Sequence, residues 1–496
     1  MNKQELSLFD CVMLGIGSAL GPEIFLLLGL AASLAGTQAI ISLGIAFVIA
    51  LLIGLCYAEL ATAIPVSGED YIFARRAFRG MLPFLVGWMV WLGNIVYSAF
   101  NAIAVAYFLK IIIPVPVGFT AISFIAFAGA LIYLGMRTLK RVQNVMVAAL
   151  VVLLAVFVYS GVGVGDWSYL PGILNGNMGA AFSTAALLFV AFIGFEDIVS
   201  VSAEIREPKK TIPRAIILTL VALAVIYISV SLTVFAVLPL SQVMSSENAV
   251  LDAASVSMGD AGKLLFSIAG LLAIATSLNA AMTAGTMNAF ALGRDGYLPR
   301  RLALRGPHGT AAIAILATAM IAIVFAATEA VAFVAYLTDF AYFLAMTVSA
   351  YALIVLRKRQ PSLERPFKVP FYPYIPLAAI LLSAMALIFI NPRSIIVGAL
   401  WLLAGVLAYY LYVIGLNRLK IALGGVLLFL ATICFTAYFL VEAAYFSLPH
   451  YASFNVNGIV LLAALACSAA GLYLMLFSCQ SKSLCKKGQA RKNIDN

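Results

Sequence analysis

The sequence has little charge and almost no histidine. Of its 496 residues, 10% are charged, 64% are hydrophobic and two are histidine. Soluble domains are only about half apolar, so this composition excludes an assembly of soluble domains. The sequence also lacks a His-Glu-x-x-His zinc motif, a Gly-x-Ser-x-Gly nucleophile motif and a phosphate-binding loop. We therefore expect neither an enzyme nor an ATP-driven pump.

The six cysteines give no sign of a disulfide. They lie in or beside long apolar runs, or in the final basic segment (Cys11, Cys56, Cys434, Cys467, Cys479 and Cys485). Disulfides need paired cysteines in an oxidising compartment, and we expect none here. No small-residue cleavage site precedes the first apolar run, so we also expect no removable signal peptide.

Long apolar runs fill the rest of the chain. A helix needs about 20 apolar residues to cross a bilayer, and lipid leaves open backbone groups without partners. The sequence predicts an all-α polytopic membrane protein with fourteen spans. They lie at 8–34, 38–64, 82–113, 117–136, 142–164, 179–203, 212–237, 263–291, 311–328, 330–356, 374–390, 394–416, 420–446 and 457–479.

The lysines and arginines predict the orientation of these spans. If the N-terminus is cytoplasmic, 27 of the 30 lie in cytoplasmic segments, leaving Lys110, Lys263 and Arg393 outside. Cytoplasmic loops are enriched in these residues, so we expect a multi-pass cell-membrane protein with both termini cytoplasmic, at 1–7 and 480–496. The +10 net charge is spread over many loops, and we expect no nucleic-acid partner.

The first span contains Gly15-Ile-Gly-Ser-Ala-Leu-Gly-Pro-Glu23, which is unusual inside a membrane. Glycine and proline weaken a helix, and lipid disfavours a charge. Proline fits the first turn of a new helix, and an acid is favourable at that end. The segment is interpreted as two half-helices with Pro22 starting the second. A simple kink, with Gly17 and Gly21 as a packing face, is the alternative.

A second interruption occurs five spans later, in Ala191-Phe-Ile-Gly-Phe-Glu-Asp197. Interrupted spans at matching positions of two halves indicate a transporter site near the midplane between inverted repeats. The predicted repeats are 8–164 and 179–356, followed by the additional helices of 374–479. Because Glu196 and Asp197 are adjacent, we expect at most one of them to face the pathway.

Six sequence blocks resemble the amino acid-polyamine-organocation (APC) superfamily of secondary transporters over roughly 8–415. The blocks are Gly17-Ser-Ala-Leu-Gly-Pro-Glu-Ile-Phe25, Tyr57-Ala-Glu-Leu60 with Pro65-Val-Ser-Gly68 and Tyr71, Gly87-Trp88, Gly194-Phe-Glu196 with Glu204 and Glu207-Pro-Lys-Lys-Thr-Ile-Pro213, Ala291-Leu-Gly-Arg-Asp-Gly-Tyr-Leu-Pro299, and Arg365-Pro-Phe-Lys-Val-Pro370. The resemblance implies a five-plus-five inverted repeat with broken helices one and six, alternating access, and four further helices. Fourteen spans are also typical of its cationic amino acid branch.

The resemblance and the breaks together define the expected substrate site. Its residues are Gly17, Ser18, Ala19, Gly21, Glu23, Phe192, Ile193, Gly194, Phe195, Glu196 and Asp197. In the family, backbone N–H groups at the first break receive the substrate carboxylate, but Pro22 has no N–H and Glu23 adds a negative charge. These departures favour a substrate with an extra amine, or a proton carried on Glu23. The alternative is that Glu23 only caps its half-helix.

Coupling to an ion is open between protons and sodium. Glu23, Thr276, Ser277 and Asp339 are candidates, since hydroxyl and carboxylate oxygens suit hard cations and acids can carry protons. The fifth span lacks the lysine that acts in proton coupling in some relatives. Hydrogen bonding between helices is the other role for the hydroxyls. We expect no cofactor or bound metal, and the sequence leaves the oligomeric state undetermined.

The sequence is therefore interpreted as a secondary active transporter of amino acids, with a possible preference for cationic ones. A transporter of polyamines or other organic amines is the alternative, and a transporter-like sensor or a channel is a further one. The aromatics Phe192, Phe195, Trp88, Trp91 and Tyr97 are candidates to wall the pocket or simply to pack. Glu59, near the basic residues 75–79, is expected to form a structural ion pair.

Overall fold

The computed structural model describes residues 6–66, 69–135, 140–169, 177–306 and 308–414. The chain divides into two units, Met1–Gly405 and Val406–Asn496, and the features below belong to the first unit unless stated otherwise. The predicted spans at 420–446 and 457–479, the 480–496 tail and the four cysteines beyond residue 420 lie outside the described residues.

Helices account for nearly all the regular structure of the described residues. The α-helices are α1 (Leu8–Ala19), α2 (Glu23–Ala35), α3 (Ala39–Ala63), α4 (Glu69–Ala77), α5 (Met81–Ile112), α6 (Val117–Tyr133), α7 (Lys140–Val164), α8 (Met178–Leu188), α9 (Asp197–Ser200), α10 (Pro208–Val237), α11 (Leu240–Ser245), α12 (Ala249–Arg294), α13 (Ala312–Ala326), α14 (Val331–Arg359), α15 (Tyr374–Ile388) and α16 (Pro392–Tyr409). Short 3-10 turns include η3 (Phe189–Phe192), and a π-helical turn, η6 (Tyr410–Ile414), follows α16. The all-α prediction is confirmed for these residues.

Many of these helices can cross a membrane. Within the described ranges, eight are long and apolar enough to do so, and four shorter apolar helices accompany them. Their burial differs strongly, since 89% of the apolar window of α5 is buried but only 22% of that of the segment Pro392–Val413, which contains α16. The exposed positions carry large apolar side chains such as Phe119, Tyr159 and Val324. Such a surface suits a lipid environment and not water.

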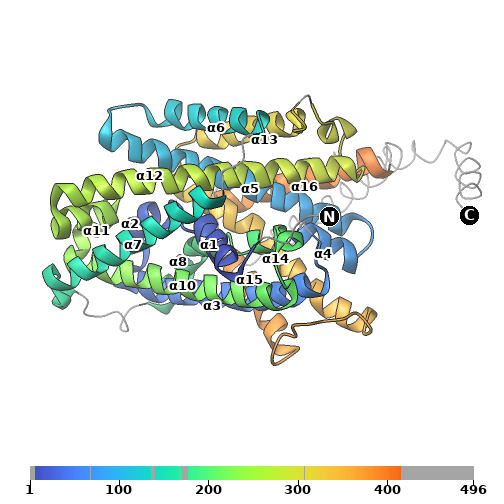
Figure 1. Cartoon of the computed structure of the whole chain (residues 1–496), viewed down its shortest axis with the longest axis horizontal. Helices are drawn as coiled ribbons and strands as arrows, with labels where there is room; N and C mark the ends of the chain where they lie inside the picture. The colour runs from blue at the N-terminus through green and yellow to red at the C-terminus, as the bar shows by residue number, and fades with distance from the viewer. Residues whose placement is uncertain (1–5, 67–68, 136–139, 170–176, 307, 415–496) are drawn as a thin grey trace, which may run out of the picture. The chain divides into compact units, whose positions relative to one another are not determined.

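Helix α5 is at the centre of the packing. It contacts α6, α12, α13 and α14, while α10 packs along α3 and against α1. In Figure 1, α3 and α10 run side by side, and α1 lies between α10 and α12. Apolar residues from all these helices are buried together, and the broken segments are placed inside this core.

The first predicted span consists of two half-helices. Ser7 caps α1 through reciprocal hydrogen bonds with Asp10, which is a capping box. The helix ends at Ala19, and α2 begins at Glu23 with Pro22 at its N-cap position. Proline fits there because its missing N–H would lie outside the helical ladder. The break is therefore at the place where the sequence predicts it.

The sixth predicted span is interrupted as well. Helix α8 passes into η3, Ile193 is extended with φ −68° and ψ 134°, and α9 starts at Asp197. Between them, Gly194 has a φ of +127°. Only glycine adopts such a backbone without strain, so Gly194 is the residue that permits this interruption.

The ends of the two broken segments are joined by backbone hydrogen bonds. The N–H of Leu6 donates to the carbonyl of Glu204 at 3.1 Å, and the N–H of Arg206 donates to the carbonyl of Leu6 at 2.9 Å. Leu6 and Ile205 thereby form a parallel β-bridge. The residue just before the first half-helix is thus fastened to the segment that follows α9.

Glu59 forms an ion pair, but not within the basic segment 75–79. Its carboxylate accepts hydrogen bonds from Arg357 at 2.5 and 2.7 Å and from the N–H of Val369 at 2.7 Å, and it lies 3.4 Å from Arg365 Nε. The expectation of a structural ion pair is confirmed, while the expected partners were wrong. Arg357 is remote from Glu59 in the sequence, but the two meet because α3 packs against α14.

Candidate functional site

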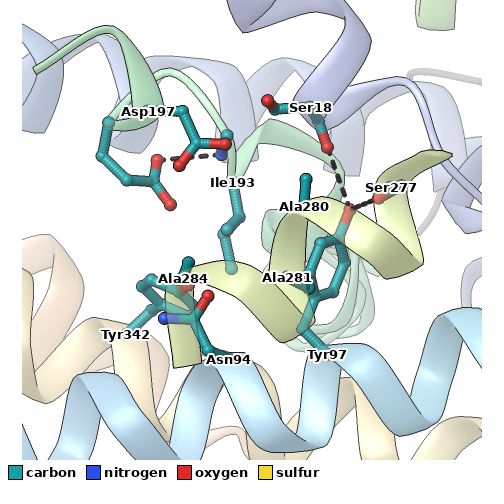
Figure 2. Close-up of a pocket in the computed structure, with 12 residues that line it drawn as sticks. Ser18, Asn94, Tyr97, Ile193, Asp197, Ser277, Ala280, Ala281, Ala284 and Tyr342 are labelled. Carbon is teal, nitrogen blue, oxygen red and sulfur yellow. Dashed lines mark hydrogen bonds between the residues drawn. The ribbon is translucent and has the colours of Figure 1, made fainter. Parts of the chain in front are cut away.

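A cavity lies between the two helix breaks and helices α5, α12 and α14. Its lining consists of Ser18, Asn94, Tyr97, Ile193, Gly194, Glu196, Asp197, Ser277, Ala280, Ala281, Ala284 and Tyr342 (Figure 2). The space between these residues, including its opening, is about 280 Å³. The residues around this space come from both helix breaks and from three spanning helices.

The two breaks touch each other directly. A Cβ atom placed on Gly194 would lie 2.6 Å from the backbone nitrogen of Ala19 and 2.8 Å from the carbonyl carbon of Ser18. Any side chain at this position would push the breaks apart. Gly194 is thus required both for its φ and for the close approach of the two backbones.

Each break is capped by a glutamate two residues after a glycine. The N–H of Gly21 donates to Glu23 Oε2 at 3.0 Å, and the N–H of Gly194 donates to Glu196 Oε2 at 2.8 Å. Helix N-termini attract anions because their N–H groups point outward. In this chain the N–H groups of both glycines already have a carboxylate of the chain itself as partner.

Tyr97 on α5 connects the first break to α12. Its hydroxyl donates to Glu23 Oε1 at 2.7 Å and lies 3.3 Å from the carbonyl oxygen of Ser18. The hydroxyl of Ser277 donates to Tyr97 at 3.4 Å. Figure 2 shows Tyr97 between Ser18 and Ser277. Tyr227 on α10 also holds this break, because its hydroxyl donates to the carbonyl of Ala19 at 2.7 Å.

The cavity wall is acidic. Both Glu196 and Asp197 line it, and its lining includes no lysine, arginine or histidine. We expected at most one of the two acids to face the pathway, and this stays a prediction. It assumed a regular helix, whereas Glu196 is the N-cap residue of the four-residue α9, directly after the turn at Gly194. A positively charged group is the natural complement of such a wall.

The predicted substrate-site residues are close together but do not all line the cavity. Of these, Ser18, Ile193, Gly194, Glu196 and Asp197 line it, as does the ion-coupling candidate Ser277. Gly17, Ala19, Gly21, Glu23, Phe192 and Phe195 are buried without being part of the lining. Glu23 nevertheless reaches the lining through Tyr97.

The remaining ion-coupling candidates differ in their surroundings. Asp339 on α14 is fully buried, and neither of its carboxylate oxygens has a hydrogen-bond partner among the described residues. The hydroxyl of Thr276 donates to the carbonyl of Ala273 at 2.7 Å, within its own helix. Of the two candidate residues on α12, Thr276 and Ser277, only Ser277 lines the cavity.

Sequence reasoning missed Asn94, Tyr342 and three alanines of α12 that complete the lining. A signal for Asn94 exists, because Asn94, Tyr97, Ser98 and Asn101 recur at the three- and four-residue spacing of one helix face. This polar stripe on the most buried helix marks the side of α5 that faces the first break. The aromatic candidates Trp88 and Trp91 instead pack with Trp401.

A family model supplies the decisive comparison. The model described as amino acid permease matches residues 6–416. The chain belongs to the amino acid permease family. The APC resemblance is thereby confirmed, and this permease is a multi-pass membrane protein whose family and relatives support amino acid transport.

Three relatives place this permease among transporters. The branched-chain amino acid permease BcaP of Bacillus subtilis is 31% identical, over 83% of this chain and 93% of its own length. The methylthioribose transporter of the same organism is 29% identical, over 82% and 93%. The chloroplastic cationic amino acid transporter 9 of Arabidopsis thaliana is 29% identical, over 60% and 56%. All three are transporters by name, which agrees with the expectation that this permease is not an enzyme.

Proposed function

We propose that this permease is a secondary active transporter that moves amino acids through the central cavity by alternating access and favours cationic substrates. The observation that carries the proposal is the acidic wall formed by Glu196 and Asp197, whose cavity has no cationic lining residue. A ligand with an extra amine supplies the missing positive charge. A neutral amino acid brings only one ammonium group together with its own carboxylate.

The glycine–glutamate caps support this preference. The Gly21 and Gly194 N–H groups that face the breaks already bind Glu23 and Glu196, and Pro22 has no N–H. A substrate carboxylate would compete with these carboxylates, whereas an amine finds carboxylates and backbone carbonyls as acceptors. The same caps favour, as a second candidate, a polyamine or another organic amine as substrate.

For coupling, we propose a proton carried on Glu23 or Asp339, with sodium as the competing ion. Glu23 is buried against Tyr97, and Asp339 is buried without a hydrogen-bond partner among the described residues. Acids at such places in membrane-spanning helices are used as proton carriers in transporters. Thr276 bonds to its own helix, while Ser277 would contribute only one hydroxyl to a sodium site.

The proposed transport cycle uses the two inverted repeats, 8–164 and 179–356, with helices of 374–479 as additions. Both termini are placed in the cytoplasm, because that orientation puts 27 of 30 lysines and arginines on the cytoplasmic side. The segment 69–79, which contains α4, is then cytoplasmic. Alternating access would open the cavity to this side and to the opposite side in turn.

Counterflow in proteoliposomes tests the proposal. Wild type, Glu23→Gln and the exposed control Glu247→Gln are loaded with unlabelled substrate and given labelled arginine, lysine, putrescine, alanine or leucine. Each exchange is measured at two pH values, with and without sodium. We expect cationic substrates to exchange, Glu23→Gln to abolish the exchange, and Glu247→Gln to match wild type.

Other outcomes would refute parts of the proposal. Equal exchange of leucine and arginine, with Glu23→Gln altering only the pH dependence, would remove the cationic preference and make Glu23 a proton carrier. Exchange of putrescine alone would favour the organic amine candidate. Flux without counterflow would indicate a channel, and binding without flux would indicate a sensor.

A further inference from the structure

A buried carboxyl outside the cavity connects α4 to two spanning helices. Asp70 is on α4, yet its side chain is fully buried. Its Oδ1 accepts hydrogen bonds from the Tyr57 hydroxyl on α3 and from the Ser349 hydroxyl on α14, the latter at 2.5 Å. Its Oδ2 has no hydrogen-bond partner among the described residues. One carboxyl group of a loop helix thus joins three elements.

Asp70 is linked to the cavity through aromatic rings. The Tyr57 ring packs edge-on against the ring of Phe195, with 5.5 Å between the ring centroids. It packs in the same way against Phe73 of α4, with 5.7 Å between the centroids. Phe195 lies between the lining residues Gly194 and Glu196. Glu196 is also near enough to Asp70 for the two carboxyl groups to interact electrostatically. Movement of α4 would therefore displace Phe195 and, with it, the second helix break.

The cations near Asp70 are engaged elsewhere. On α4 itself, Arg75 donates to Asp295 at 2.5 Å, and Tyr71 donates to the same carboxylate at 2.6 Å. On α14, Arg357 is bound to Glu59, and Arg359 donates to the carbonyl of Ala77 on α4 at 3.4 Å.

The remaining elements around α4 add little positive charge. Glu196, the N-cap residue of α9, is an acid near Asp70. The charged residue of α5, Lys110, is in its last turn, far from α4. Asp70 thus has two hydroxyl groups and a further acid around it, without an ion pair among the described residues.

These surroundings affect the charge state of Asp70. Burial raises the pKa of this carboxyl to about 6, although the hydrogen bonds from Ser349 and Tyr57 act to lower it. The pKa of the exposed carboxyl is near 4. The buried arrangement therefore binds a proton more tightly than the exposed one. It is favoured as the pH falls through about 6 and is weakened above that pH.

We propose that Asp70 is a proton-binding site that couples the protonation state on the cytoplasmic side to the closure of α4 over the cavity. The placement of this site in the cytoplasm rests on the orientation given under the proposed function. With a proton bound, Asp70 stays between Tyr57 and Ser349 and holds α4 closed. When the proton leaves, the buried charge favours separation of α4, which opens the cavity to the cytoplasm.

The proposal gives a magnitude for the pH effect. For a single group titrating near pH 6, the ionised fraction rises from about one quarter at pH 5.5 to nearly all at pH 7.5, which is about a fourfold change. The opening of α4 should change by that factor between these two cytoplasmic pH values. A larger change would require further titrating groups.

Cysteine labelling measures the opening of α4 without requiring transport. Phe73→Cys is made in a cysteine-free full-length chain, because Phe73 is fully buried against Tyr57. Labelling by a membrane-impermeant maleimide is divided by that of Arg76→Cys, an exposed position on the same helix. We expect this ratio to rise about fourfold from pH 5.5 to 7.5. Addition of Asp70→Asn, which keeps the acceptor oxygen but carries no charge, should hold it at the low value at both pH values.

Two further measurements distinguish a proton site from a merely structural contact. Ser349→Ala removes a hydrogen bond that lowers the pKa of Asp70, so the midpoint of the labelling curve should move to higher pH. In oriented proteoliposomes, counterflow should fall about fourfold as the cytoplasmic pH is lowered to 5.5. The control Glu364→Gln changes an exposed acid paired with Lys209 and should retain this dependence, while Asp70→Asn should abolish it.

The outcomes separate this inference from the proposed function. A labelling ratio that does not change with pH, or a pH dependence that persists in Asp70→Asn, overturns the proton site. If no tested substrate shows counterflow but the labelling ratio changes fourfold and is constant in Asp70→Asn, the transport proposal fails and the proton site stands.

Discussion

The contact between the two helix breaks can be tested by giving Gly194 a side chain. In Gly194→Ala, the new Cβ would lie 2.6 Å from the nitrogen of Ala19, whereas ordinary van der Waals contact begins near 3.4 Å. The difference means that the breaks must separate by about 0.8 Å. The φ of +127° adds backbone strain of about 1–3 kcal/mol for a residue other than glycine.

We expect this separation to reduce transport far more than insertion into the membrane. A misplacement of about 1 Å in a binding site can lower a rate by about a hundredfold, so counterflow of Gly194→Ala should fall by roughly 30- to 100-fold. Counterflow is measured at equal amounts of reconstituted protein, and thermal unfolding is followed in detergent. Gly44→Ala is the matched control, because a Cβ at Gly44 on α3 meets nothing within 4 Å.

The control should transport normally, and its thermal stability should equal or exceed that of wild type because alanine is the better helix former. If Gly194→Ala transports within threefold of wild type, the close contact of the breaks is not needed for function. Equal losses in both variants would mean that an added methyl group in these segments in general, and not this contact, is responsible.

Three further substitutions test other contacts of the structure. Tyr97→Phe removes the hydroxyl that donates to Glu23. We expect the substrate concentration for half-maximal counterflow to rise about tenfold, since a lost hydrogen bond to a charged group costs about 1.5–3 kcal/mol. An unchanged concentration would contradict this role. Trp401→Phe removes one of two reciprocal hydrogen bonds with Trp88, and thermal unfolding should show a loss of about 1 kcal/mol with counterflow retained. Glu59→Gln leaves its arginines without a carboxylate and should lower the unfolding free energy by about 3–5 kcal/mol, whereas a loss below 1 kcal/mol would show that water replaces the ion pair.

Hydropathy was sufficient to find the helices, because a membrane requires long apolar segments. The first break was also predictable, since Gly21, Pro22 and Glu23 each act on the backbone within a few residues. The second half-helix was expected to start at Pro22, and Pro22 is the N-cap residue directly before Glu23. These features depend on residues that are neighbours in the sequence, so the sequence alone is enough to predict them.

Features that depend on contacts between remote segments were not predictable in the same way. The partners of Glu59 are about 300 residues away, and no local pattern singles out Arg357. The expectation for Glu196 and Asp197 assumed helix geometry across Gly194, where the chain turns. The role of Tyr97 depends on the position of α5 relative to the first break, which hydropathy does not specify.

The backbone bridge between Leu6 and Ile205 has a mechanical consequence. It joins the broken segments at one end, while the contact of Gly194 with Ser18 and Ala19 joins them near the cavity. Two points of attachment along their length prevent one segment from tilting independently of the other. The two broken segments should therefore move together as one rigid unit. A substrate bound at either break would shift both segments relative to the surrounding helices.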